Sequence, residues 1–284
     1  MNTDILLLKT YFGWTSFINS EKAARKSFRL FQKVRKKNIR RREEDFFASS
    51  RKFQVLMMKE NVDCFEIGNP IGEVVILVHG WDSNAGSMSK IALAMAEQNK
   101  RVITFNLPGH AFSKSSSTNL IECKDAFLAL LDFLNLKEPF SIVAHSFGSA
   151  VSTYALAKSN YQIDKIILLT NPNKIEEIFK QFKTGIGLGN RAYKKLLTIT
   201  TNKLGEPLNN LSVQENLKKI QYNKLLLIHD KFDKVLSFKH SIEINNEIEN
   251  SQLITIENVG HYKMLWTDEV INRCVGFVNG KEVF

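Results

Sequence analysis

The sequence has few residues that could cross-link the chain or bind a metal. Only three cysteines, Cys64, Cys123 and Cys274, occur among its 284 residues. Their odd number and wide spacing argue against a disulfide framework and indicate free thiols in a reducing cytosol. His, Cys and carboxylate residues show no metal-ligand spacing. The sequence therefore predicts no metal and no cofactor.

Long apolar runs are also missing. No stretch approaches the roughly 20 apolar residues that a membrane-spanning helix needs. The N-terminus lacks the pattern of a signal peptide, because Asp4 lies where a positive region belongs and Lys9 interrupts the apolar run 5–8. We therefore expect a cytoplasmic protein.

Positive charge is present in excess and is concentrated near the N-terminus. The net charge is +10; residues 1–45 hold twelve Lys and Arg against five Asp and Glu, and the remainder holds 27 against 24. Apolar Ala24, Phe28 and Phe31 recur at helical spacing, which predicts helix over residues 20–45. The charge reversal from 40–42 to 43–45 suits a corner between two helices. We interpret residues 1–50 as a basic helical arm.

Three roles remain open for this arm. It packs its phenylalanines on the rest of the chain or on a second subunit of a homodimer, or it makes a peripheral contact with an anionic membrane surface. Nucleic-acid binding is disfavoured, because the charge lies on one short helix without a known reader module. The sequence predicts no nucleic-acid partner.

Strand and helix patterns alternate after residue 73. Alternation of this kind predicts a mostly parallel sheet flanked by helices, and the two strands before it form an antiparallel edge hairpin. The expected strands lie near 53–58, 62–67, 73–78, 101–105, 139–144, 165–170, 224–229 and 252–256. The expected helices lie near 86–99, 118–135, 147–159, 238–248 and 265–278.

Residues 171–220 interrupt this rhythm between two expected strands. They read as an inserted helical cap or lid of two or three short helices, with a flexible glycine-rich linker at 185–189. The core then comprises residues 51–170 and 221–284. Phe179 and Phe182 are candidates to line an apolar substrate pocket; the alternative is that they pack the cap onto the core.

One short segment carries the pattern of a nucleophile elbow. An apolar strand leads into Ser146, a helical pattern follows at once, and small Ala144 and Gly148 flank the serine at −2 and +2. Bulky residues would clash there, because strand and helix nearly touch in so tight a turn. The alternative is a serine that only caps the following helix.

Two further polar residues follow expected strands. Asp233 comes after the strand 224–229, and His261 comes after the strand 252–256. The order Ser146, Asp233, His261 is the order of an α/β-hydrolase triad. Asp230 competes with Asp233 for the acid, whereas Asp164 lies at the wrong end of its strand. The other histidines, at 79, 110, 145, 229 and 240, do not combine a post-strand loop with this order.

Five segments together resemble the landmarks of the α/β-hydrolase fold superfamily, in its Ser-Asp-His esterase/lipase-like branch. They are HGW at 79–81, NLPGHAFS at 106–113, AHSFGSA at 144–150, HDKFDKV at 229–235 and VGHYKM at 259–264. The resemblance covers residues 53–284. The run 26–31 is also similar to a basic arm found in some bacterial members. Two departures are Ala144 in place of glycine and Asn106 where many relatives carry aspartate.

The resemblance implies roles for individual residues. The backbone N–H groups of Trp81 and Phe147 form an oxyanion hole. The resemblance also favours Asp233 over Asp230 as the acid, because relatives commonly carry glycine at the position of Asp230. His79 and His145 serve packing or hydrogen bonding, and both are also candidates for the substrate pocket.

The sequence thus predicts a serine hydrolase that cleaves a small-molecule carboxylic ester or thioester with an apolar acyl group. Serine at position 146 argues against dehalogenase and epoxide hydrolase chemistry, which uses an aspartate nucleophile. Two alternatives stay open, a carbon–carbon bond hydrolase with the same triad and a ligand-binding protein that does not hydrolyse.

Overall fold

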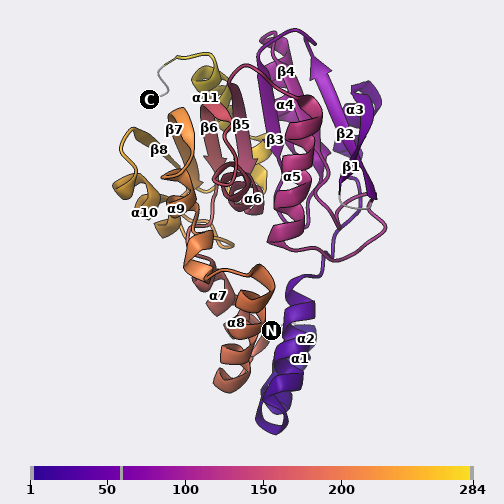
Figure 1. Cartoon of the computed structure of the whole chain (residues 1–284), viewed down its shortest axis with the longest axis vertical. Coiled ribbons are helices and arrows are strands. Elements are labelled where there is room, and N and C mark those ends of the chain that lie inside the picture. The colour runs from indigo at the N-terminus through magenta and orange to yellow at the C-terminus, as the bar shows by residue number, and fades with distance from the viewer. Residues whose placement is uncertain (1–2, 58–59, 282–284) are drawn as a thin grey trace. The chain divides into compact units, whose positions relative to one another are not determined.

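The computed structural model describes residues 3–57 and 60–281. It divides the chain into two compact units (Figure 1). The helical unit comprises residues 1–33 and 174–212, and the sheet unit comprises residues 34–173 and 213–284. The sequence predicts the N-terminal arm and the insertion as separate segments, whereas their helices pack together in one unit.

The sheet unit is built on an eight-stranded sheet in the order β1-β2-β4-β3-β5-β6-β7-β8. β1 and β2 pair antiparallel, as do β2 and β4, and all other neighbours are parallel. The strands are β1 (Arg51–Met57), β2 (Glu60–Gly68), β3 (Val74–Val78), β4 (Arg101–Phe105), β5 (Phe140–His145), β6 (Gln162–Leu169), β7 (Gln221–Asp230) and β8 (Ser251–Ile256). The predicted fold class and edge hairpin are confirmed.

Helices cover both faces of this sheet. The longer ones are α3 (Arg41–Ser49), α4 (Ser89–Glu97), α5 (Leu120–Leu134), α6 (Phe147–Leu156), α10 (Lys239–Glu247) and α11 (Asp268–Val278). Short turns of helix are η1 (Ala85–Met88), α9 (Val213–Leu217) and η3 (Lys263–Trp266). The five helices predicted for the core are present, two of them preceded by a 3-10 turn.

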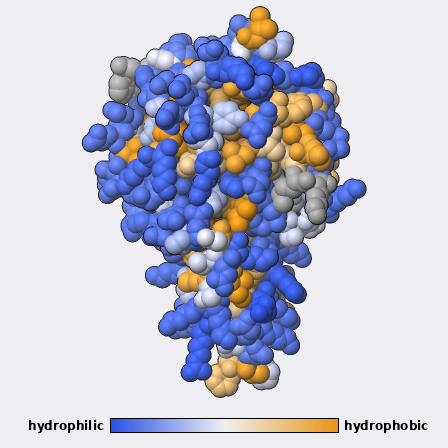
Figure 2. Space-filling model, in the orientation of Figure 1, coloured by the Kyte–Doolittle hydropathy of each residue, from blue (hydrophilic) through white to orange (hydrophobic). Residues whose placement is uncertain are grey.

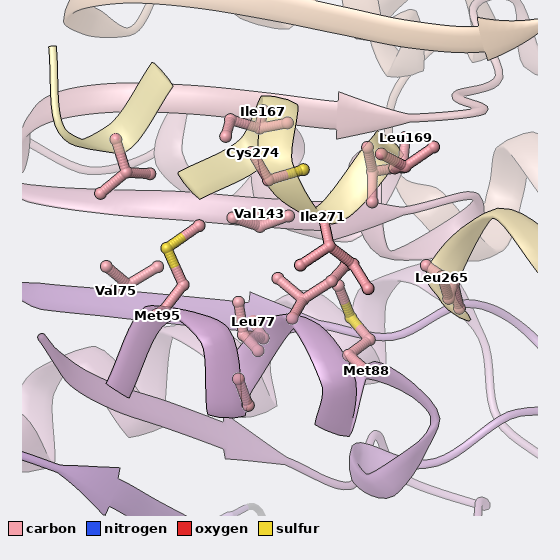
Figure 3. Close-up of a cluster of buried hydrophobic side chains, with 14 of the residues drawn as sticks. Val75, Leu77, Met88, Met95, Val143, Ile167, Leu169, Leu265, Ile271 and Cys274 are labelled. Atoms are coloured by element: carbon pink, nitrogen blue, oxygen red, sulfur yellow. The ribbon is translucent and has the colours of Figure 1, made fainter. Parts of the chain in front are cut away.

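The main hydrophobic core lies between the sheet and helices α4 and α11 (Figure 3). Leu77 of β3 and Val143 of β5 meet Met88 and Met95 next to or in α4, and Cys274 of α11 joins them. All of these side chains are buried. Residues alternate along a strand, so the neighbours of Leu77 and Val143 face the opposite side of the sheet. A sheet buried on both faces holds its carboxyl strand ends in fixed positions, and the site described below lies there.

The helical unit has its own apolar interior. It contains α1 (Thr3–Ile18), α2 (Ser20–Phe31), α7 (Ile175–Ile186), α8 (Asn190–Leu204) and η2 (Leu208–Leu211). Phe12 of α1 and Ala24 of α2 are buried with Phe179 of α7 and Leu196 of α8. Phe31 stacks on Phe179 with ring centroids 4.4 Å apart. The two N-terminal helices therefore bury their apolar faces on the insertion.

The prediction of helix throughout residues 20–45 is wrong, although a new helix does begin near the expected corner at 40–45. Helix α2 ends at Phe31, the chain is then irregular, and α3 begins at Arg41. The intervening backbone is held by other partners, since the Val34 N–H donates to the Ser116 carbonyl and the Arg35 N–H donates to Asp82 Oδ1. These hydrogen bonds replace the helical ones that the periodicity suggested.

The glycine-rich segment 185–189 has a packing role. Gly187 adopts a φ of 70°, and a Cβ there would lie 2.9 Å from the Lys9 carbonyl oxygen. The Gly189 N–H donates to Ser16 Oγ at 3.0 Å. Glycine thus lets the turn between α7 and α8 approach α1, where the sequence suggested a flexible linker.

Within the described residues, no helix combines the length and the apolar character needed to cross a membrane.

Candidate functional site

Ser146 lies at the sharp turn between β5 and α6. Its backbone has φ 52° and ψ −120°, a conformation that L-residues rarely adopt and that costs about 1–3 kcal/mol. The turn is held by the Ser146 N–H, which donates to the Leu169 carbonyl at 2.9 Å. The surrounding sheet therefore stabilises a strained serine at the N-terminus of a helix, where partial positive charge gathers.

Two glycines allow the backbone to close around this serine. A Cβ on Gly148 would lie 2.6 Å from the His79 carbonyl oxygen and closer still to that of Val78. A Cβ on Gly80 would lie 2.9 Å from His145 Nδ1 and 3.1 Å from Ser146 Cβ. Helix α6 thus packs closely on the end of β3, and the loop after β3 passes against Ser146. Larger residues at 148 and 80 would prevent both approaches.

His261 connects the serine to an acid. His261 Nε2 is 3.0 Å from Ser146 Oγ, and His261 Nδ1 is 2.7 Å from Asp233 Oδ2. The three residues come from the loops after β5, β7 and β8, and all three side chains are buried or nearly so. The structure thus brings together the serine, histidine and aspartate that the sequence singles out. The geometry joins a hydroxyl, an imidazole and a carboxylate by hydrogen bonds in the order that a nucleophile, a base and an orienting acid require.

The Asp233 carboxylate is held by several donors. Oδ1 accepts hydrogen bonds from the N–H groups of Val235 (2.7 Å) and Leu236 (3.1 Å), and Oδ2 accepts one from Thr170 Oγ1 (2.7 Å). Burial alone would raise the pKa of Asp233, but the hydrogen bond and charge of His261, with these donors, keep that pKa well below its usual range. Asp233 therefore stays ionised beside the imidazole.

The alternative acid, Asp230, has a different position. Its Oδ1 accepts the Phe232 N–H at 2.7 Å, and its Oδ2 accepts the N–H groups of Val259 and Gly260. The carboxylate thus links the end of β7 to the loop that carries His261. Asp230 holds this loop, whereas Asp233 bonds the imidazole itself.

Two histidines shape the loop after β3. His79 Nδ1 donates to the Gly80 carbonyl (2.8 Å) while His79 Nε2 accepts the Leu107 N–H (2.9 Å). His110 Nε2 likewise accepts the Asp82 N–H at 3.2 Å and His110 Nδ1 donates to Pro108. This pattern requires neutral rings, and burial lowers the pKa of both. Together they fix the backbone on either side of Trp81.

Trp81 and Phe147 are neighbours beside the serine turn. Their rings meet edge to face with centroids 5.0 Å apart. Within the described part of the chain, neither backbone N–H has a hydrogen-bond acceptor. Phe147 directly follows Ser146 in the chain. Trp81 directly follows Gly80, the residue whose backbone lies against the Ser146 side chain. Two unpaired donors from these positions are what an oxyanion needs.

His145 holds the loop after β8, which carries His261, by a hydrogen bond to its backbone. The His145 ring is fully buried, and its Nε2 donates to the His261 carbonyl at 2.9 Å. Burial, with the nearby His261, lowers the pKa of His145 to about 3. His145 and His79 therefore act through hydrogen bonds to loops, and neither exposes side-chain surface to a pocket as the sequence suggested.

The two phenylalanines proposed for the pocket lie in the helical unit. Phe179 is 1% exposed and stacks on Phe31, and Phe182 packs edge to face on the same ring at 5.0 Å. Phe31 of helix α2 thus packs on both rings; Phe179 is fully buried and Phe182 half-buried. The sequence could not indicate this partner, because it lies about 150 residues away in the chain.

Sequence reasoning missed Thr170 and the role of Asp230. Thr170 follows β6 with φ 50°, which aims Oγ1 at Asp233. A polar residue directly after an apolar strand was the available signal, since that edge of the sheet carries the site. The departure at Asn106 also has a role, because its Oδ1 accepts the Ala85 N–H at 2.9 Å.

The arrangement suits nucleophilic chemistry without a metal ligand set. Among residues 3–57 and 60–281, no group of three or more His, Cys, Asp or Glu side chains could hold a metal ion. The site offers five groups for chemistry: the hydroxyl, imidazole and ionised carboxylate of Ser146, His261 and Asp233, and the two backbone N–H groups of Trp81 and Phe147. Such a set can attack a carbonyl carbon and stabilise the resulting oxyanion.

Comparison with known proteins finds similar sequences and similar folds. A family model described as the alpha/beta hydrolase fold matches residues 73–185. A serine hydrolase-like protein of Dictyostelium discoideum is 31% identical over 99 residues, covering 34% of this chain and 27% of that protein. Putative esterase/lipase 2 of Mycoplasma genitalium is 27% identical over 103 residues, 36% of this chain and 38% of that protein. The matches thus span well under half of either relative.

Among solved structures, a putative lipase from Acinetobacter baumannii AYE superposes with a TM-score of 0.65. It shares 18% identity, and the match covers 84% of this chain and 93% of that one. At this identity the likeness shows the fold alone.

Proposed function

We propose that this chain, which has the α/β-hydrolase fold, is a serine hydrolase that cleaves carboxylic esters or thioesters through Ser146, His261 and Asp233. The observation that carries the proposal is the chain of hydrogen bonds from Ser146 Oγ to His261 Nε2 (3.0 Å) and from His261 Nδ1 to Asp233 Oδ2 (2.7 Å). The names of the relatives, a serine hydrolase-like protein and an esterase/lipase, support the same reaction class.

The reaction follows from the positions of these groups. His261 Nε2 takes the proton of Ser146 Oγ as that oxygen attacks the ester carbonyl carbon. The oxyanion forms between the N–H groups of Trp81 and Phe147, each worth on the order of 3 kcal/mol. Collapse expels the alcohol or thiol, which receives the proton from His261. A water molecule, deprotonated by His261, then releases the acid from the acyl-enzyme.

Asp233 and the buried histidines support this cycle electrostatically. The Asp233 carboxylate holds the Nδ1–H tautomer and stabilises the imidazolium that forms. His145, His79 and His110 stay neutral because burial lowers their pKa values. The positive charge that appears during the reaction is therefore on His261 rather than on its neighbours.

The test is labelling with a fluorophosphonate, which reacts only with an activated serine. We expect the wild type and Ser152→Ala to label and Ser146→Ala to remain unlabelled, since Ser152 lies in α6 with its hydroxyl donating to the Gly148 carbonyl. Hydrolysis of p-nitrophenyl esters should fall at least about 10⁴-fold in Ser146→Ala. A folded wild type that neither labels nor hydrolyses these esters would contradict the proposal and favour a ligand-binding protein.

A further inference from the structure

Helix α1 carries an apolar face that the helical unit does not cover. Its inner face buries Phe12 and Ser16 against that unit. On its outer face Leu7, Tyr11, Trp14 and Ile18 recur at intervals of four, three and four residues, which places them in one stripe. Leu6 and Phe17 flank this stripe. The six exposed side chains form what we call the α1 face: Leu6 (48%), Leu7 (63%), Tyr11 (39%), Trp14 (71%), Phe17 (91%) and Ile18 (63%).

This face differs from the scattered apolar residues found on any protein surface. Isolated exposed residues such as Ile71 need no explanation. The α1 face instead collects six large side chains on one helix of 16 residues that contains only two charged ones, Asp4 and Lys9. Figure 2 shows hydrophobic surface at the end of the helical unit where α1 joins α2. A contiguous patch of this kind indicates a surface that another phase or molecule covers.

Charge identifies the covering phase. Residues 1–33 and 174–212 hold 13 Lys and Arg against five Asp and Glu, whereas the rest of the chain holds 26 against 24. The excess positive charge of the protein therefore lies almost entirely on the unit that carries the α1 face. Exposed cations of this unit include Lys22, Arg25, Lys26, Arg29, Lys180, Arg191, Lys194, Lys195 and Lys203.

One cation directly borders the α1 face. Lys26 Nζ lies 4.9 Å from the centroid of the Tyr11 ring and bonds its hydroxyl. An ammonium beside aromatic rings matches the boundary of a lipid bilayer, where Trp and Tyr rings lie at headgroup depth and cations meet lipid phosphates. A second copy of this unit would instead bring two positively charged surfaces together, which repel.

We propose that the α1 face binds the surface of an anionic phospholipid bilayer, with α1 lying in the plane of the interface. The apolar stripe enters the acyl boundary, and Lys26 with other exposed cations of the helical unit contacts the phosphates. At 16 residues α1 is shorter than the roughly 20 residues of a spanning helix, so it lies on the membrane rather than across it. This inference concerns the helical unit and does not depend on the proposed hydrolysis.

The test is co-sedimentation of the full chain with vesicles of phosphatidylglycerol mixed with phosphatidylcholine, and with vesicles of phosphatidylcholine alone. We expect binding to the anionic vesicles that weakens as salt is raised, and much weaker binding to the neutral ones. Trp14→Ser/Phe17→Ser should bind at least about tenfold more weakly, because both large apolar side chains are lost from the stripe.

A matched control removes apolar surface from the other unit. Leu56 and Ile71 are 67% and 91% exposed, which matches the exposed fractions of Trp14 (71%) and Phe17 (91%). The variant Leu56→Ser/Ile71→Ser should bind vesicles like the wild type. Repeating the assay on Ser146→Ala keeps any lipid hydrolysis from altering the vesicles. Failure of the proposed function would leave this binding unchanged.

Three results would overturn the inference. The first is absence of binding to anionic vesicles, and the second is an equal loss of vesicle binding in both double variants. The third is a wild type that does not bind vesicles but forms a dimer in light scattering, which Trp14→Ser/Phe17→Ser dissociates. The last result would assign the α1 face to a second copy of the chain.

Discussion

The carboxylate of Asp230 accepts a hydrogen bond from the backbone N–H of Gly260, the residue that directly precedes His261. The end of β7 thereby holds the loop after β8, and the imidazole reaches Ser146 from a backbone that this carboxylate fixes. Three residues later, Asp233 bonds the same imidazole through its side chain. Two neighbouring aspartates therefore have separate structural tasks, one for the loop and one for the ring.

Replacing Asp233 by Asn should reduce turnover far more than its loss of stability can explain. The amide cannot stabilise the imidazolium and favours the wrong tautomer of His261, so we expect kcat to fall by about 10³- to 10⁴-fold. Thermal denaturation should show that the variant still folds, with a lowered Tm because one of the two hydrogen-bonded oxygens of Asp233 is replaced by an NH₂ group. An unchanged kcat would exclude Asp233 as the acid.

Replacing Asp230 by Asn should act mainly on stability. An amide has one accepting oxygen where the carboxylate has two, so it cannot accept all the hydrogen bonds from the N–H groups of Phe232, Val259 and Gly260. We expect a loss of about 1–3 kcal/mol in unfolding free energy, measured by denaturant titration. A loss of kcat as large as that of Asp233→Asn, without a change in stability, would contradict the division of roles.

Thr170 should contribute to turnover through its hydrogen bond to Asp233. In Thr170→Val the branched shape is kept but the 2.7 Å bond is lost, and a bond to a charged group is worth about 1.5–3 kcal/mol. We expect kcat/KM to fall by roughly tenfold to a hundredfold. Thr170→Ser restores the hydroxyl and should recover most of the activity; equal losses in both variants would show that only packing matters.

Mild acid should destabilise the sheet unit at pH values above those at which its carboxylates titrate. Burial lowers the pKa of His145 to about 3 and that of His229 to about 4, whereas in the unfolded chain both protonate near 6.5. Between those values the unfolded state binds more protons, so stability falls as pH is lowered from about 7 to about 5. Each histidine contributes a loss of about 2 kcal/mol. Denaturant titrations at both pH values measure the change, and His229→Gln should reduce it; a flat profile would contradict these pKa shifts.

Two helical glycines should respond in opposite directions to alanine. Gly148→Ala places a methyl group against the carbonyls of Val78 and His79, so we expect a loss of at least about 3 kcal/mol or misfolding. A Cβ on Gly185 in α7 would meet no atom within 4 Å, so Gly185→Ala should stabilise its helix by about 0.5–1 kcal/mol. Circular dichroism melts distinguish the two. Equal tolerance of both changes would show that the close approach at Gly148 relaxes freely.

Local patterns in the sequence determined much of this protein. Apolar runs located the strands of the sheet, most clearly the central strands β3 and β5, because a strand buried on both faces is apolar along its length. Small residues beside Ser146 indicated the tight turn, since Gly148 has no room for a side chain. The order of Ser146, Asp233 and His261 indicated which strand ends carry polar side chains toward one another.

Tertiary structure alone decided which partners these residues meet. The sequence could not show that Phe31 stacks on Phe179 or that α1 packs beside α7, because contacts between distant segments leave no periodic pattern. Nor could it show that helix α2 ends at Phe31, where Val34 bonds Ser116 across the chain. Asp230 and Asp233 have the same carboxylate, and only the fold, by placing Gly260 beside one and the His261 ring beside the other, gives them different tasks.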